Sequence, residues 1–202
     1  MNADRKKDIK LKATEINNLS EQFQLLHATY AVEEYIKNIA KEIYAEKLTE
    51  LTLRIQNKMQ RDLRTDAELE EKKQLEKIIK RNRISIDISY IDINNEDIAR
   101  VVKVDNAFTI YLAASLRDSI RLENGKSNYA VIRKIRRLMS HELGHLVLHT
   151  KDLLVDDSTQ GSLNICDEEK EQEANIFRDE LLYLRKKRNK EIEADGGAPN
   201  LY

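Results

Sequence analysis

The sequence predicts an α+β fold, in which a small antiparallel sheet packs on two helices and a helical arm lies at the N-terminus. Along residues 1–80, apolar side chains recur at spacings near three and four, which is typical of amphipathic helices. Apolar and polar residues alternate from Ile84 onward, and this period of two is typical of a half-buried strand. Two further helical patterns cover residues 129–149 and 167–191.

These patterns divide the chain into three expected segments. Residues 1–80 form the helical arm, residues 81–190 form the main domain, and residues 191–202 form a disordered tail that holds the only proline. Of the 202 residues, 41% are apolar, which is typical of a globular protein and too many for a disordered one. The charged fraction of 35% favours long solvated helices over a fold dominated by sheet.

Three β-prone runs make up the expected sheet. They cover residues 84–89, 98–104 and 107–112. Asp105 and Asn106 separate the last two runs and suit a tight turn, although the usual glycine is missing. Three short strands that follow one another in this way indicate an antiparallel meander.

Capping residues mark where two of the helices begin. Thr65 followed by Glu68 fits a capping box, which predicts a helix from there to about Lys80. Ser127 or Asn128 can cap the helix that follows them.

Composition also bears on location and partners. The only cysteine is Cys166, so no internal disulfide can form and nothing indicates an oxidising compartment. The charged N-terminus lacks the apolar core of a signal peptide, and no apolar run approaches the roughly 20 residues of a membrane span. We therefore expect a cytoplasmic protein, although a protein exported without a cleavable signal would look the same. The net charge of -1 gives no reason to expect direct binding to nucleic acid or to a membrane.

An H-E-x-x-H motif lies within the helix expected over residues 129–149, and consists of His141, Glu142 and His145. Residues four apart lie on one face of a helix, so both imidazoles can bind the same metal ion. Glu142 lies about 100° around the helix from His141. From there its carboxylate can take a proton from a metal-activated water and later deliver it to a leaving amine. The motif therefore predicts a zinc site with Glu142 as the general base of peptide-bond hydrolysis.

The residues around the motif support this interpretation. The helix is otherwise apolar, and burying two histidines and a glutamate without partners is costly. A metal ion would provide those partners, whereas the alternative is a pair of hydrogen-bonded core histidines. The apolar positions are Ala130, Val131, Ile132, Ile135, Leu138, Leu146, Val147 and Leu148.

A catalytic zinc site needs a third protein ligand. One class of zinc peptidase takes a third histidine six residues after the motif, with a glycine three residues before it. This chain has Leu148 and Lys151 at those positions, which excludes that class. His149 lies about 12 Å along the helix axis from His141, so we expect a helix-end residue rather than a ligand. The other class takes a glutamate from a following helix. Spacing alone does not choose among the candidates Glu168, Glu169, Glu171 and Glu173.

Two sequence blocks resemble the ImmA/IrrE family of zinc metallopeptidases. They are HELGHLVLH over residues 141–149 and EQEANIFRDELL over residues 171–182. The resemblance implies that Glu171 is the third zinc ligand, with Glu173 as the alternative, and that Asn175 orients a zinc-binding imidazole. The spacing from Glu171 to Asn175 is also similar to the E-x-x-x-D helix of thermolysin-like enzymes, which makes the site gluzincin-like.

The chain departs from the family pattern in two places. Arg178 and Asp179 stand where small residues are usual, and the proline that often follows the two leucines is missing. Residues 1–80 match no motif of the family. The resemblance nevertheless implies an intracellular regulatory peptidase whose protein substrate is a DNA-binding transcriptional repressor.

Other expectations remain open alongside this one. The chain can instead be a non-catalytic interaction protein, stabilised by zinc and binding a partner through its helical arm, or a peptidase with another role. A substrate strand is expected to add to the sheet along residues 107–112. The oxyanion-stabilising residue is unassigned, with Tyr111, Tyr129 and Tyr183 as candidates. The basic residues 185–188 are expected to form a solvated helix end, and the oligomeric state stays open.

Overall fold

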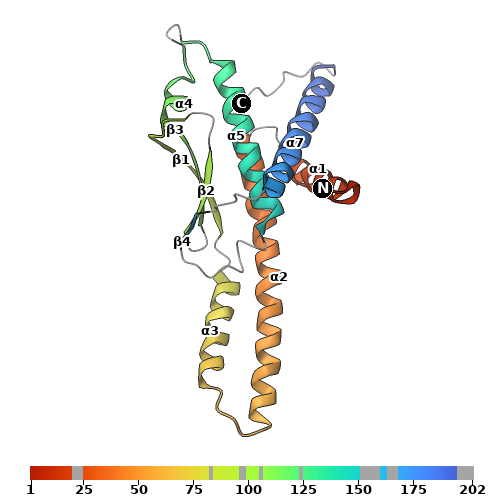
Figure 1. Cartoon of the computed structure of the whole chain (residues 1–202), viewed down its shortest axis with the longest axis vertical. Coiled ribbons are helices and arrows are strands. Elements are labelled where there is room, and N and C mark those ends of the chain that lie inside the picture. The colour runs from red at the N-terminus through yellow and green to blue at the C-terminus, as the bar shows by residue number, and fades with distance from the viewer. Residues whose placement is uncertain are drawn as a thin grey trace.

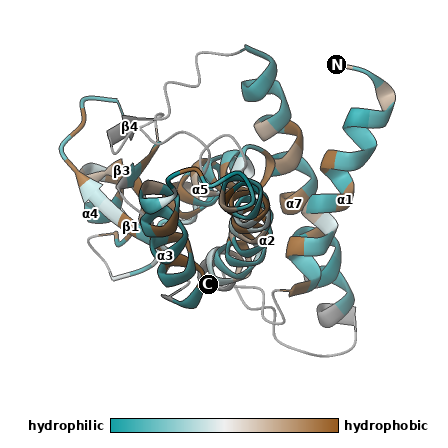
Figure 2. Ribbon diagram, turned by 90° about the horizontal axis from the view of Figure 1, so that it is seen from below, coloured by the Kyte–Doolittle hydropathy of each residue, from teal (hydrophilic) through white to brown (hydrophobic). Residues whose placement is uncertain are grey.

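The protein is described by a computed structural model, which has a mixed α+β architecture (Figure 1). The described residues are 1–19, 25–81, 84–95, 99–104, 107–122, 125–150, 160–162 and 168–194. A four-stranded sheet lies on one side of helices α2 and α5, while α7 and α1 lie on the other side (Figures 1 and 2). The predicted combination of helices with a small sheet is therefore confirmed.

Three helices form the N-terminal part of the chain, as the apolar spacing predicts. They are α1 (Ala3–Leu19), α2 (Leu25–Met59) and α3 (Asp66–Arg81). Helix α3 begins directly after Thr65, where the capping box predicts its start, and Glu68 binds Lys58 of α2. Helices α2 and α3 form an antiparallel hairpin that extends well beyond the sheet (Figure 1).

The sheet consists of β1 (Ser85–Ile91), β2 (Arg100–Val104), β3 (Ala107–Ala113) and β4 (Gln160–Ser162), in the order β1-β3-β2-β4. Strands β2 and β3 pair antiparallel, as expected, but β1 pairs parallel with β3. The predicted antiparallel meander is therefore wrong. The segment between β1 and β2 is longer than a hairpin turn, so these two strands need not be neighbours, and β3 lies between them.

This strand order also corrects the expected binding edge. Strand β3, which contains residues 107–112, has neighbours on both sides and cannot accept a further strand. In the described part of the sheet the edges are β1 and β4. Strand β4 lies between the two helices expected over residues 129–149 and 167–191, outside the three β-prone runs. The turn expected at residues 105–106 falls outside the described residues. At the β1 edge, the Ile86 N–H donates to the Glu33 carboxylate of α2 at 3.1 Å.

Among the described residues, α4 (Ala114–Asp118) and α5 (Tyr129–Leu148) follow β3, and α7 (Glu168–Ala194) follows β4. The side chain of Asn128 caps α5 by accepting a hydrogen bond from the Val131 N–H, so Asn128 rather than Ser127 is the cap. Helix α7 runs to Ala194 and thus includes residues 191–194, which we expected to belong to the tail. Residues 195–202 fall outside the described part. None of the described helices has both the length and the apolar character needed to cross a membrane.

One hydrophobic core connects the N-terminal helices to the helix that carries the motif. Ile9 and Ile16 of α1 are fully buried in it, together with Leu143 of α5, Phe108 of β3 and Phe177 of α7. In Figure 2, α1 lies alongside α7 and is mainly hydrophilic in colour, because only one narrow side of it enters the core. The boundary expected near residue 80 therefore separates segments that share a single core.

The shared core predicts that α1 contributes directly to stability. Replacing Ile9, which is fully buried, with alanine should lower the free energy of unfolding by about 2–5 kcal/mol, because the substitution leaves a cavity between α1 and α7. Leu11→Ala is the matched control on the same helix, since Leu11 is 58% exposed and should cost little. Urea denaturation followed by circular dichroism measures both. Equal stabilities of the two variants would mean that α1 folds independently of the core.

Candidate metal centre

His141 and His145 lie one turn apart on the same face of α5. Their imidazole rings meet edge to face, with centroids 4.7 Å apart. The two Nε2 atoms are 3.1 Å from each other, so both rings point the same type of atom toward a common position. The Nδ1 atoms of both rings lie buried and make no hydrogen bond to any described residue.

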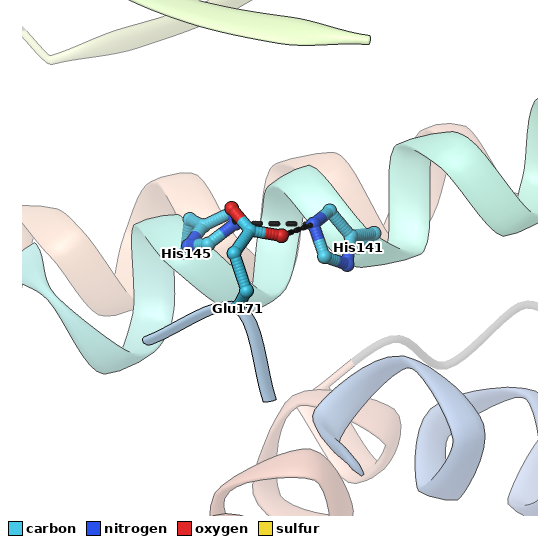
Figure 3. Close-up of side chains that lie close together, drawn as sticks. All are labelled: His141, His145 and Glu171. Atoms are coloured by element: carbon cyan, nitrogen blue, oxygen red, sulfur yellow. Dashed lines mark hydrogen bonds and ion pairs between the residues drawn. The ribbon is translucent and has the colours of Figure 1, made fainter. Parts of the chain in front are cut away.

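Glu171 reaches this pair of histidines from the first turn of α7. One carboxylate oxygen lies 3.1 Å from His141 Nε2 and the other lies 3.2 Å from His145 Nε2 (Figure 3). Among the described residues, these three form the group of side chains whose geometry could hold a metal ion. Glu173, the alternative third ligand, does not belong to this group.

The spacing of the three side chains fits a tetrahedral metal ion. Zinc binds nitrogen and oxygen ligands at about 2.0–2.2 Å, which places neighbouring ligand atoms of a tetrahedral site roughly 3.3 Å apart. The observed separations of 3.1, 3.1 and 3.2 Å are close to that value. Hydrogen bonding among the three side chains explains these separations less well. If both neutral imidazoles donate to Glu171 from Nε2, their two Nε2 atoms cannot also form a hydrogen bond with each other.

Both histidines are held in the neutral form that metals bind. The pKa of His145 is lowered to about 3, mainly by burial and also by the neighbouring His141 and His149. Burial also lowers the pKa of His141, although Glu171 opposes this effect. At neutral pH each Nε2 atom can therefore offer a lone pair without first losing a proton from a charged ring.

A close approach of α5 and α7 brings Glu171 to the histidines. Gly144 lies between the two histidines in the sequence, and a Cβ atom at this position would lie 3.2 Å from Ala174 Cα and 3.2 Å from the Ala174 carbonyl oxygen. Phe177 would be equally close. The missing side chain of Gly144 thus allows α7 to pack directly on the turn that carries the motif.

Glu142 lies beside the metal-binding group without belonging to it. Its side chain is buried, with 7% of the residue exposed. Its pKa is raised to about 7, mainly by burial and also by the nearby Glu171 carboxylate, while the Val101 backbone of β2 opposes the shift. A carboxylate with a pKa close to the working pH can accept and then release a proton, as general acid–base catalysis requires.

Glu173 has a different partner. Arg5 of α1 donates from Nε to one Glu173 carboxylate oxygen at 2.5 Å and from Nη2 to the other at 2.6 Å. This bidentate pair lowers the pKa of Glu173 and directs its carboxylate away from the histidines. The geometry thus favours Glu171 over Glu173 as the third ligand.

Asn175 contacts the site in a way that differs from the expectation. We expected its side-chain oxygen to accept a hydrogen bond from an imidazole, but Oδ1 accepts from Arg178 Nη1 at 2.6 Å. Asn175 still lies close enough to His141 to raise the pKa of its imidazole.

The remaining candidates lie outside the metal-binding group. His149 ends α5, and its ring centroid is 5.5 Å from that of His145, as expected for a helix-end residue. Glu168 and Glu169 are exposed in the first turn of α7. Cys166 falls outside the described residues.

The tyrosines and the basic cluster also have different surroundings from those expected. Tyr129 and Tyr183 are 53% and 60% exposed, and Tyr111 lines a separate pocket on the outer side of the sheet. No described tyrosine lines the cleft at the metal centre. Within the cluster expected to be solvated, Arg185 is buried, and burial together with nearby Arg136 lowers its pKa to about 10.

Three features of the site were not expected from the sequence. Arg5 pairs with Glu173 across 168 positions of the chain, and no local pattern indicates such a pair. The role of Gly144 depends on a helix that follows much later. The third feature is the pair Arg133 and Arg137, which precede His141 at intervals of four residues. This feature could have been found, because the spacing on one helix face is visible in the sequence.

Comparisons of the chain with protein-family models, with curated proteins and with solved structures give no significant match. The resemblance to the ImmA/IrrE family thus stays a prediction based on the two sequence blocks.

The geometry predicts which side chains hold zinc. His145→Ala and Glu171→Ala should each weaken zinc binding by more than the roughly 10–100-fold that is typical of residues that only orient a ligand. Glu173→Ala is the matched control, because Glu173 lies two residues away on the same helix and binds Arg5 instead. Titration against a competing chelator measures the affinities. Unchanged affinity in Glu171→Ala would exclude Glu171 as a ligand.

The raised pKa of Glu142 predicts a pH-dependent difference between the metal-free wild type and Glu142→Gln. The folded protein holds this proton more tightly than the unfolded chain, since the pKa rises from 4.5 to about 7 on folding. The wild type therefore loses stability as the pH rises through this range, by up to about 3 kcal/mol, and the glutamine variant does not. The free energy of unfolding of Glu142→Gln, relative to that of the wild type, should therefore increase from pH 5 to pH 8. Urea denaturation in a chelator tests this, and a difference that does not vary with pH would contradict a buried, protonated Glu142.

Proposed function

We propose that the protein is a zinc-dependent peptidase in which Glu142 is the general base. The observation that carries the proposal is the position of a buried glutamate with a pKa of about 7 directly beside a group of two neutral histidines and one carboxylate. His141, His145 and Glu171 would hold the ion. When bound, zinc supplies the Lewis acidity that activates water and polarises a substrate carbonyl.

The side chains have separate tasks in this reaction. Glu142 takes a proton from the attacking water and transfers it to the leaving amine as the peptide bond breaks. The proton that the water loses is therefore the one that the amine gains. The Val101 backbone of β2 lies close enough to the Glu142 carboxylate to lower its pKa, which opposes the effect of burial.

The number of ligands favours catalysis over a purely structural zinc site. Structural zinc sites are closed by four protein ligands, whereas catalytic sites use three and keep one position open. The described residues supply three ligands. A structural site also has no use for a buried glutamate with a raised pKa beside the metal. A non-catalytic interaction protein is accordingly the weaker proposal.

The substrate class rests on the sequence blocks alone. Their resemblance to the ImmA/IrrE family supports a regulatory peptidase that cleaves a DNA-binding repressor. Co-expression with repressors encoded beside the gene, followed by mass spectrometry of the fragments, tests this part of the proposal.

Glu142→Gln separates metal binding from catalysis. The variant should keep zinc and the fold, because Glu142 is not a ligand, but should lose about 10²–10⁴-fold in activity, as is typical of removing a general base. Zinc content by elemental analysis and cleavage of a proteome-derived peptide library measure the two properties. A variant that still cleaves at the wild-type rate would place the general base elsewhere. Absence of cleavage by the zinc-loaded wild type would favour the non-catalytic alternative.

A further inference from the structure

A cleft between α5 and α7 opens directly at the metal centre. Its volume is about 650 Å³, which lies within the range of roughly 300–1,000 Å³ that is typical of ligand-binding pockets. His141 and Glu171 line it at one end. The two helices run in opposite directions (Figure 1). The lining residues extend from His141 back to Arg133 on α5 and from Glu171 to Arg178 on α7, so the cleft leads from the metal centre along both helices.

The other walls of this cleft carry a concentration of positive charge. Arg133, Lys134 and Arg137 line it from α5, and Arg178 lines it from α7. Against these four cations stands a single lining carboxylate, Glu171, which is assigned to the metal. The whole chain has a net charge of -1, so the positive charge of the cleft is a local feature and not a property of the entire surface.

The cations are arranged around the metal centre by helix geometry. Arg133, Arg137 and His141 follow one another at intervals of four residues, so they lie along the same face of α5. Arg133 and Arg137 are exposed. Their guanidinium groups are therefore accessible to a molecule that lies in the cleft and reaches the metal centre.

Arg178 is held in position at the opposite wall. Its side chain is only 13% exposed. Nη1 donates to Asn175 Oδ1 at 2.6 Å, and Nε donates to Asp179 at 2.8 Å. Asp179 is itself 68% exposed, so water screens much of its charge. The positive charge of Arg178 is close enough to His141 to lower the pKa of that imidazole.

We propose that this cleft selects peptide substrates that carry a carboxylate close to the scissile bond. The proposal deepens the proposed peptidase function and rests on it. Guanidinium groups bind carboxylates through paired hydrogen bonds, so the α5 arginines and Arg178 would hold an acidic residue while the adjacent peptide bond lies at the metal centre. The carboxylate can belong to an acidic side chain or to the C-terminus of the peptide.

Nucleic acid is the less favoured occupant. Binding of a phosphate backbone relies on many phosphate contacts along a basic surface. Here the cations converge on one cleft that ends at a site for peptide hydrolysis. A carboxylate on the peptide substrate therefore accounts for both features.

Matched peptides test the proposal on the full-length, zinc-loaded protein. A peptide that the protein cleaves is synthesised in its acidic form and with glutamine or asparagine in place of each acidic residue near the scissile bond. Each form is made with a free and with an amidated C-terminus, which distinguishes the two sources of the carboxylate. We expect a KM roughly tenfold lower for the form that keeps the recognised carboxylate, with kcat little changed.

Variants of the cleft assign this preference to the arginines. Arg133→Gln combined with Arg137→Gln should remove most of the preference, and because both residues are exposed the fold should tolerate the change. Arg178→Gln is the second variant and should have the same effect from the other wall. Arg54→Gln, an exposed arginine of α2 that does not line the cleft, is the control and should keep the preference.

A binding measurement separates failure of this proposal from failure of the proposed function. It uses zinc-loaded Glu142→Gln and the fluorescence anisotropy of a labelled glutamate-rich peptide and its glutamine twin. Tighter binding of the glutamate peptide that depends on the arginines, without cleavage of any peptide by the wild type, would support the cleft and contradict the peptidase. Cleavage without a charge preference would overturn the cleft proposal alone.

Two further outcomes would also overturn it. A change in kcat alone in the arginine variants would mean that the cations act on the transition state and not on a substrate carboxylate. Stronger competition by a short single-stranded oligonucleotide than by the glutamate peptide would assign the cleft to nucleic acid.

Discussion

The packing of α7 against the motif-bearing turn of α5 at Gly144 is the contact on which the metal centre depends. Any side chain at this position would meet the Ala174 backbone and Phe177 at 3.2 Å, so the two helices would have to move apart. Glu171 lies three residues before Ala174 and touches both histidines at 3.1 and 3.2 Å. Even a small separation of the helices would therefore lengthen both contacts. Helix α1 supports the arrangement from outside, because Ile9 and Ile16 pack into the same core and Arg5 holds Glu173.

The electrostatics of the site follow from how deeply each group is buried. His145 and Glu142 lie in the interior, where desolvation keeps the imidazole neutral and the carboxyl group easily protonated at neutral pH. Glu171 is more exposed, with 44% of its side chain accessible. The site thus combines buried, uncharged imidazoles and a buried proton carrier with a carboxylate that reaches the surface. Arg133 and Arg137 lie at exposed positions of the cleft, where water still solvates them.

Local sequence patterns predicted the parts of this structure that depend on neighbours in the chain. The four-residue spacing of His141 and His145, the cap at Asn128 and the extent of α5 all follow from helix geometry, and all agree with the structure. The order of the strands did not follow, because a period of two shows which side of a strand is buried but not which strand lies next to it. The separation of Glu171 from Glu173 also required tertiary information. Both are acidic residues on one helix, where spacing alone left the choice open. In the structure, Glu171 contacts the two histidines and Glu173 binds Arg5 of a distant helix.

The edge of the sheet at β1 has a further consequence for how the protein behaves at high concentration. The Ile86 N–H, which faces away from β3, is already bound to the Glu33 carboxylate of α2, and Lys37 in turn holds Glu33 at 2.8 Å. An incoming strand from another molecule would have to displace this carboxylate and would gain a backbone hydrogen bond only at the cost of an existing one. Exposed strand edges are common starting points for fibril growth, and proteins often block them with charged side chains. Glu33 does this from a helix, and it blocks the Ile86 position of the β1 edge.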